Sequence, residues 1–124
     1  MIARMDKTLM FVGALMGGLG VGIGAFGAHG LRGRLTPDML TVFETGARYQ
    51  MYHALAILGT AALMSRVEGR AVVIAGWSFF AGILIFSGSL YALALTGVGV
   101  LGAITPIGGL AFLVGWICLL VAAF

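Results

Sequence analysis

The side chains in this sequence that could bind a ligand or carry a proton gather in three short stretches. Glu44 and Arg48 are four residues apart, a spacing that lets opposite charges pair on one face of a helix. Tyr49 and His53 repeat this interval one residue further on, and histidine is the side chain whose charge changes most readily near neutral pH. The candidate ligand-binding residues are His29, Glu44, Arg48, Tyr49, Gln50, His53, Ser87 and Tyr91.

These residue types do not form a catalytic pattern. No spacing of a nucleophile and a base points to hydrolysis, so we expect no enzyme activity, no catalytic residues, no metal site and no cofactor. A haem held between His29 and His53 is an alternative, which would make the protein a membrane redox subunit. Cys118 stands alone in an apolar run, where a small buried residue is the simpler interpretation.

The composition assigns the chain to a lipid bilayer. Of 124 residues, 61% are apolar and 9% are charged, whereas a soluble domain carries about 25% charged residues. Too few polar side chains are present to cover a surface that faces water, so the partner is the lipid bilayer. The net charge of +3 is small and gives no reason to expect a nucleic-acid partner. The length allows one domain, residues 1–124.

The distribution of charge and proline predicts an all-α integral membrane protein, a four-transmembrane-helix bundle. Residues 71–124 carry no formal charge, and one helix of that length would be about 80 Å long, so this run must fold into two spans. The break lies between Thr96 and Pro106. Thr36–Pro37 and Thr105–Pro106 each combine a helix N-cap with proline at the first helical position. The predicted spans are 8–31, 47–65, 71–95 and 104–123, with a polar connection and amphipathic helix start at 32–48.

Orientation follows from the basic residues, which favour the cytoplasmic side. Four of them fall on the side of the N-terminus and three on the other, which favours a multi-pass protein with both termini in the cytoplasm. The first group is Arg4, Lys7, Arg66 and Arg70, and the second is Arg32, Arg34 and Arg48.

The glycine-rich stretch "GIGAFGAHG" (22–30) matches a dinucleotide-binding pattern, but that pattern requires a preceding strand. Here the glycines lie inside a run long enough to cross a membrane, where small residues four apart let helices approach closely. The predicted helix-packing residues are Gly13, Gly17, Gly18, Gly20, Gly22, Gly24 and Gly27. Their partner is another helix of this chain, a second copy in a homo-oligomer, or a larger membrane complex.

The polar groups are expected in one leaflet, because helix 1 ends, helix 2 begins, helix 3 ends and helix 4 begins on the same side. On helix 2 the opposite face is predicted to meet lipid; its residues are Phe43, Ala47, Met51, Ala54 and Leu58. The polar set is either structural or a pocket for a small ligand or a lipid headgroup. The function expected is a non-enzymatic accessory or small-ligand or lipid-binding protein. A small oligomeric transporter is an alternative, although its acid, Glu44, lies at an interface.

Four blocks of the sequence carry a family resemblance: "FGAHGLRGRL" (26–35), "FETGARYQMYHALAIL" (43–58), "FSGSLYAL" (86–93) and "TPIGGLAFLVGW" (105–116). Together they resemble domain-of-unknown-function family 423, which includes YgdD-like small inner-membrane proteins and a eukaryotic transmembrane relative. The resemblance implies a four-helix protein of the inner (cytoplasmic) membrane and supplies no activity. The matching positions are Gly27, His29, Gly30, Glu44, Tyr49, Gln50, His53, Ser87, Gly88, Tyr91, Pro106, Gly108, Gly109 and Trp116.

Overall fold

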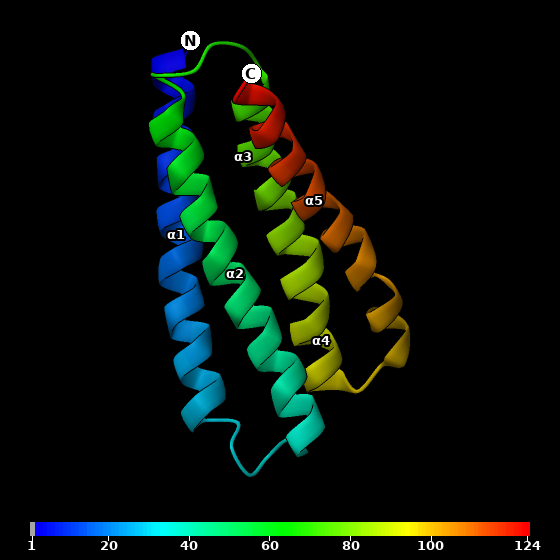
Figure 1. Cartoon of the computed structure of the whole chain (residues 1–124). Coiled ribbons are helices and arrows are strands. Elements are labelled where there is room, and N and C mark those ends of the chain that lie inside the picture. The colour runs from blue at the N-terminus through cyan, green and yellow to red at the C-terminus, as the bar shows by residue number, and fades with distance from the viewer. Residues whose placement is uncertain (1) are drawn as a thin grey trace.

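The chain folds into a bundle of long helices that run up and down alongside one another (Figure 1). The structure is a computed structural model that describes residues 2–124, with side chains from Met5 onward. The elements are α1 (Ile2–His29), α2 (Pro37–Leu63), α3 (Ala71–Gly82), the π-helical turn η1 (Ile83–Ser87), α4 (Gly88–Thr96), the 3-10 turn η2 (Gly99–Ala103) and α5 (Thr105–Ala122). Both ends of the described chain and the α2–α3 loop lie at one end of the bundle (Figure 1). The predicted all-α fold is confirmed.

Three of these helical stretches are long and apolar enough to cross a membrane: Met5–His29, Ala71–Thr96 and Gly99–Ala122. The second of them is α3, η1 and α4 read as one continuous rod. The sequence predicted four spans, and α2 does not reach the same apolar content because Arg48, Gln50 and His53 lie in its central part. Composition therefore assigns three spans, and α2 is the fourth helix of the bundle.

Helices α1 and α2 pack closely because glycines on α1 receive large side chains from α2. A Cβ atom added to Gly20 would lie 2.6 Å from the Met51 sulfur, which leaves no room for a side chain. The three contacts repeat every seven residues along α1, the spacing of a helix–helix seam. They are Gly13 with Leu58, Gly20 with Met51, and Gly27 with Phe43.

The prediction that glycines of α1 are helix-packing residues therefore holds for Gly13, Gly20 and Gly27, which are seven residues apart, and not for the predicted pairs four residues apart. Gly17 is loosely packed, with its nearest neighbour, the Ala54 Cβ, 3.9 Å from an added Cβ. Gly18, Gly22 and Gly24 meet nothing within 4 Å, so within this chain they are not packing residues. A four-residue count cannot separate these sets, because glycine recurs on every face of α1.

The face of α2 that was predicted to meet lipid is instead its packing face. Phe43, Ala47 and Ala54 are buried, and Met51 and Leu58 are partly buried against α1. The prediction was wrong because it assigned polar side chains to the interior. In this pair the glycines of α1 leave space that only large apolar side chains can fill.

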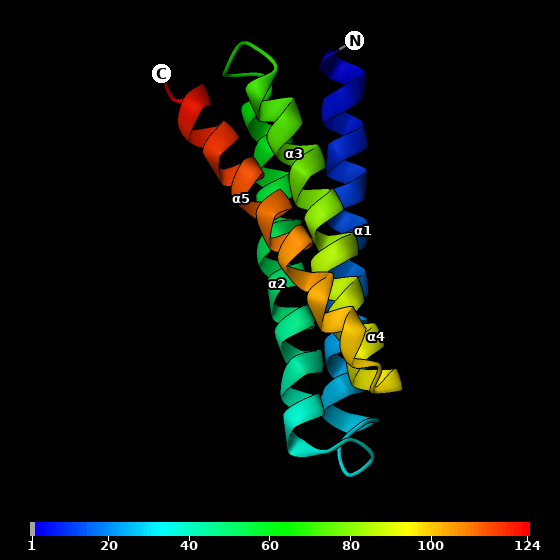
Figure 2. The ribbon, with the colours of Figure 1, turned by 90° about the vertical axis from the view of Figure 1, so that its right-hand side faces the viewer.

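Helix α5 packs against α3 and η1 by the same device and crosses them obliquely (Figure 2). One of its glycines faces an aromatic ring of α3, another faces the backbone of η1, and one glycine of α3 faces an aromatic ring of α5. The pairs are Gly108 with Phe86, Gly115 with Phe79, and Phe112 with Gly82. An added Cβ on Gly108 would meet the backbone of Phe86, so this crossing fixes the position of α5 against η1.

The two threonine–proline starts behave differently. At α2 the Thr36 hydroxyl accepts a hydrogen bond from the Met39 amide, so this N-cap prediction is confirmed. Helix α5 does begin at Thr105, but Ile104 occupies the cap position and no side chain caps the helix. The predicted capping role was wrong because the Thr105 hydroxyl pairs with the Ser89 hydroxyl of α4.

The break predicted between Thr96 and Pro106 is confirmed. Helix α4 ends at Thr96, and Gly97 follows with φ 72°, a left-handed conformation that favours glycine. The short turn η2 then reverses the chain before α5.

Candidate functional site

Most of the polar side chains buried within the bundle lie near its middle, and Thr60 lies nearer the end that holds the α2–α3 loop. Helix α2 begins at Pro37, so Gln50 and His53 occupy its centre. Gln50 is 3% exposed and His53 is 5% exposed. Gln50 reaches Met16, which is central in the first span. The sequence interpretation placed Gln50 and His53 at the start of the span 47–65; in the structure they lie halfway along α2, with Gln50 beside the middle of α1.

Gln50 joins three helices. Its side-chain nitrogen Nε2 donates a 2.8 Å hydrogen bond to the Met16 carbonyl of α1. Its oxygen Oε1 accepts a 2.6 Å hydrogen bond from the Tyr91 hydroxyl of α4. The amide thus pairs with a donor on one neighbour and an acceptor on the other, as a buried polar group requires in lipid.

His53 makes a hydrogen bond through each ring nitrogen. The indole Nε1–H of Trp116 on α5 donates to His53 Nε2 over 3.1 Å. Because Nε2 is the acceptor, the ring hydrogen lies on Nδ1 and donates to the Tyr49 carbonyl over 2.8 Å. The Phe112 ring stacks on the imidazole with 3.6 Å between centroids. This geometry selects a neutral histidine of one tautomer, with neither nitrogen free for a metal.

Ser87 connects η1 to α2. Its hydroxyl donates a 2.7 Å hydrogen bond to the Gly46 carbonyl, and the serine is fully buried. Gly46 has no room for a side chain, since an added Cβ would lie 2.8 Å from the Tyr91 ring. The hydroxyl therefore joins η1 to α2 by a hydrogen bond. Within residues 2–124 it has no adjacent base that would make it a nucleophile.

The remaining candidate residues lie outside this buried set. His29 is exposed at the last residue of α1, and Glu44 and Arg48 are exposed on the outer side of α2. Tyr49 is 36% exposed and contacts the rings of Phe86 and Phe112. The structure therefore brings together Gln50, His53, Ser87 and Tyr91, with Tyr49 at their edge, and leaves His29, Glu44 and Arg48 outside.

The two histidines do not meet. His53 lies level with Gly17 and Gly20, because the adjacent residues Ala54 and Met51 approach those glycines. His29 is further along α1 by about 14–18 Å, at about 1.5 Å per residue. One haem iron cannot span that separation with two axial nitrogens. Among the residues that the structure describes, no three His, Cys, Asp or Glu side chains are close enough to hold a metal.

Several members of this network were not predicted as site residues. Trp116 and Phe112 of α5 surround His53, and Ser89 of α4 pairs with Thr105. Trp116 lies in one of the four blocks that carry the family resemblance, so the sequence did contain a signal for this residue. The π-helical turn that directs Ser87 toward α2 has no sequence signature here, because this stretch is almost uniformly apolar and contains no periodic pattern in which a one-residue shift would show.

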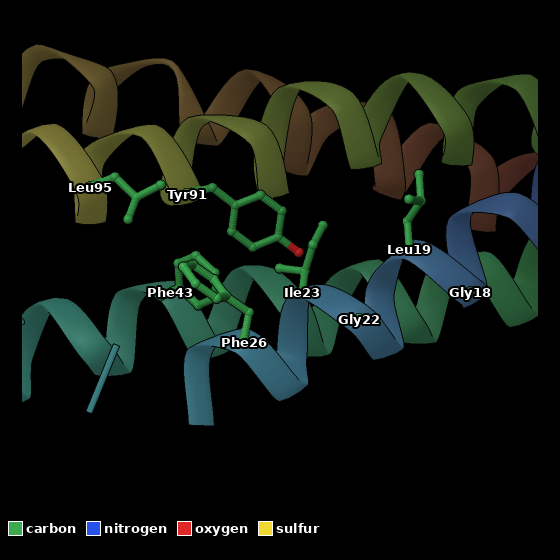
Figure 3. A pocket seen from close by; sticks show the side chains of 8 residues that line it. All are labelled: Gly18, Leu19, Gly22, Ile23, Phe26, Phe43, Tyr91 and Leu95. Atoms are coloured by element: carbon green, nitrogen blue, oxygen red, sulfur yellow. The ribbon is translucent and has the colours of Figure 1, made fainter. Parts of the chain in front are cut away.

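A groove opens beside the network, between α1 and α4 and above Phe43 of α2 (Figure 3). Its volume is about 470 Å³. The Tyr91 ring extends into the space between the helices, while its hydroxyl is bonded to Gln50. The lining residues are Gly18, Leu19, Gly22, Ile23, Phe26, Phe43, Tyr91 and Leu95. The glycines without packing partners, Gly18 and Gly22, are therefore the floor of this groove.

The family model described as "Protein of unknown function (DUF423)" matches residues 23–109. The chain belongs to the DUF423 family. Among its relatives, the UPF0382 membrane protein YwdK of Bacillus subtilis is 50% identical over 118 residues, which are 94% of this chain and 96% of the relative. A UPF0382 membrane protein of Staphylococcus aureus is 51% identical, covering 95% of this chain and 96% of the relative. No solved structure matches the chain.

This membership confirms the predicted resemblance and makes the DUF423 chain a membrane protein of an uncharacterised family. The matched region contains both halves of the Gln50–Tyr91 bond and the Ser87–Gly46 bond. It ends at residue 109, before Phe112 and Trp116.

Proposed function

We propose that this DUF423 protein is a non-enzymatic, four-span protein of the inner membrane that holds a lipid acyl chain in the groove between α1 and α4. The observation that carries the proposal is the groove itself, whose lining is almost entirely apolar. Its volume of about 470 Å³ is in the range of small-molecule sites. A groove at this depth of a membrane excludes water, so its occupant must be apolar.

The four-span arrangement is supported by the packing of α2. The glycine contacts of α1 follow α2 from Phe43 to Leu58, so the two helices run side by side over most of their length. Because α1 is apolar enough to cross a membrane, α2 crosses with it. The buried amide and imidazole on α2 are tolerated since each has its partners inside the bundle.

The interior of the bundle favours binding over transport. The buried polar groups of the central network pair with one another or with backbone carbonyls. Glu44 is exposed on the outer side of α2, so it does not provide the deep acid that proton-coupled transport requires. These groups hold helices together, and the open space lies beside them.

The orientation we propose has both termini in the cytoplasm. The end of the bundle that holds the α2–α3 loop carries Lys7, Arg66 and Arg70, and the other end carries Arg32 and Arg34 in its loop. The basic excess favours the former as the inner side. A single cysteine introduced at Arg34 or at Glu68, with Cys118 replaced by serine, tests this. An impermeant thiol reagent added to whole cells should label only the cysteine at position 34.

Filling the groove tests lipid binding. Gly22 meets nothing within 4 Å, so Gly22→Leu adds a side chain to the groove without striking the bundle. Ala14→Leu is the matched control, since Ala14 is exposed on the same helix and does not line the groove. Native mass spectrometry of protein released from mild detergent should show a bound lipid in the wild type and in Ala14→Leu, and its loss in Gly22→Leu.

Two outcomes would contradict the proposal. Equal lipid retention in Gly22→Leu and wild type would show that the groove does not hold the lipid. A dimer mass without lipid in the wild type, lost in Gly22→Leu, would identify a second copy of the chain as the occupant of the groove.

A further inference from the structure

One carboxylate oxygen near the start of α1 is buried without a partner. Asp6 Oδ1 is the only buried side-chain nitrogen or oxygen in the described part of the chain that makes no hydrogen bond. Leaving such an atom unpaired is unfavourable, and more so for a charged group than for a neutral one. Asp6 as a whole is only half-buried and lines a groove, so the rest of its carboxylate is open to a donor from outside the protein.

A second groove begins at this carboxylate. It lies between the first turns of α1 and the last turns of α2, and its volume is about 480 Å³. Asp6 and Lys7 supply its charged end, and the rest of its lining is apolar: Met10, Leu58, Ala61 and Ala62. These helix ends lie at the end of the bundle that also holds the α2–α3 loop (Figure 1). Exposed Arg66, Glu68 and Arg70 in that loop indicate the headgroup level of the membrane.

We propose that this groove binds a phospholipid whose headgroup carries a primary ammonium, the ethanolamine class. The ammonium pairs with the Asp6 carboxylate where it lines the groove, and the exposed Lys7 ammonium contacts the lipid phosphate. The upper part of one acyl chain lies along Met10 and Leu58. The headgroup presents a positive and a negative charge to side chains of the opposite sign.

This pairing predicts selectivity between headgroups of equal net charge. A primary ammonium has three N–H donors, whereas the quaternary ammonium of a choline lipid has none. Choline therefore cannot hydrogen-bond to the Asp6 carboxylate, although its phosphate can still contact Lys7. A glycerol headgroup brings the phosphate without a cation, and the carboxylate of Asp6 then faces an unneutralised negative charge.

The site is separate from the groove between α1 and α4. That groove uses residues 18 to 26 of α1 with α4, and this one uses the start of α1 with the end of α2. The two proposals can therefore fail independently. Gly22→Leu should leave the headgroup preference at Asp6 unchanged, and substitutions at Asp6 should leave the acyl groove intact.

The test is a lipid titration of the full-length protein in a mild detergent, read by native mass spectrometry. Ethanolamine, choline and glycerol phospholipids with the same acyl chains are the probes. Because a hydrogen bond to a charged group is a strong one, we expect the wild type to retain the ethanolamine lipid roughly 10-fold better than the choline lipid. Asp6→Asn should lower this ratio, because the amide oxygen that replaces the carboxylate still accepts a hydrogen bond but carries no charge. Asp38→Asn, which changes an exposed acid at the other end of the bundle, is the matched control and should leave the ratio unchanged.

Two further variants separate the parts of the site. Lys7→Gln should weaken ethanolamine and choline lipids equally, because both carry the phosphate. Ala62→Leu fills the apolar part while Asp6 stays in place, so it should reduce retention of all three lipids even if Asp6→Asn fails to fold. Equal retention of ethanolamine and choline lipids by the wild type would overturn the proposal. So would a preference that is undiminished in Asp6→Asn, or unchanged lipid retention in Ala62→Leu.

Discussion

The contact between Trp116 and His53 makes a sharp prediction, because it supplies the donor to one ring nitrogen, Nε2, of the buried imidazole. Trp116→Phe keeps an aromatic ring on α5 and removes the N–H that donates to His53 Nε2 over 3.1 Å. The indole is 44% exposed, so the smaller ring does not leave a closed cavity inside the bundle. The change in unfolding free energy therefore reports mainly on the lost hydrogen bond.

The expected size of the effect follows from the environment of the bond. Interhelical hydrogen bonds in membrane proteins contribute about 0.6 kcal/mol on average and about 1.7 kcal/mol at most. His53 is 5% exposed, so Nε2 has no water to replace the indole. An acceptor left unpaired adds to the loss, and we expect Trp116→Phe to destabilise the fold by about 1–2 kcal/mol.

A double-mutant cycle isolates the bond from other changes. His53→Phe retains a ring that can stack on Phe112 and loses both ring nitrogens. The coupling energy between Trp116→Phe and His53→Phe should be about 0.6–1.7 kcal/mol. Trp77→Phe is the matched control, because the Trp77 ring meets Phe80 and its indole makes no hydrogen bond within residues 2–124. It should change stability without loss of a hydrogen bond and should show no coupling to His53→Phe.

The assay is reversible unfolding in mixed micelles followed by circular dichroism, which does not depend on tryptophan emission. Nitrogen-15 NMR of labelled histidine gives a second readout, in which wild-type His53 should show the hydrogen on Nδ1. In Trp116→Phe the Nε2 resonance should move because its donor is lost, while the hydrogen stays on Nδ1, where the Tyr49 carbonyl still accepts it. A coupling energy near zero, together with a wild-type ring that carries its hydrogen on Nε2, would refute the reasoning.

Two further outcomes are expected from the packing and from the Gln50 bond. Gly108→Ala should destabilise the fold by about 1–3 kcal/mol in the same unfolding assay, because the added Cβ meets the backbone of Phe86. Gly109→Ala, with open space around it, should be neutral or slightly stabilising. Equal effects of the two variants would show that α5 does not cross η1 closely. Tyr91→Phe should destabilise by about 0.6–1.7 kcal/mol, since it removes the donor to Gln50 Oε1 and leaves the ring in place, and a stability equal to wild type would mean that Gln50 has another donor.

Parts of the fold were accessible from local sequence because local chemistry decides them. Thr36 and Pro37 start α2 whatever surrounds them, since the cap bonds lie within one turn. The break after Thr96 depends on Gly97, whose left-handed conformation is likewise a local matter. Thr105 shows the limit of this logic, because a hydroxyl from α4 competes for the capping group.

The candidate site was predicted only in part, since its members are chosen by contacts between helices. Gln50, His53, Ser87 and Tyr91 were candidates because polar residues in a membrane helix require partners. Glu44 was a candidate for the same reason, yet it faces outward on α2. Helical periodicity gives the faces of a helix but not which face is inside, and here the glycines of α1 settled that choice.

By itself the sequence determined that this chain is an α-helical membrane protein. So few charged side chains cannot cover a surface in water, and an apolar run of about 25 residues satisfies its backbone hydrogen bonds in lipid only as a helix. Tertiary structure alone decided which side of each helix is buried. The heptad contacts of Gly13, Gly20 and Gly27 draw the large side chains of α2 onto α1, and this turns Gln50 and His53 toward α4 and α5. The same rotation leaves Gly18 and Gly22 open as a groove, since a helix that packs one face must leave another uncovered.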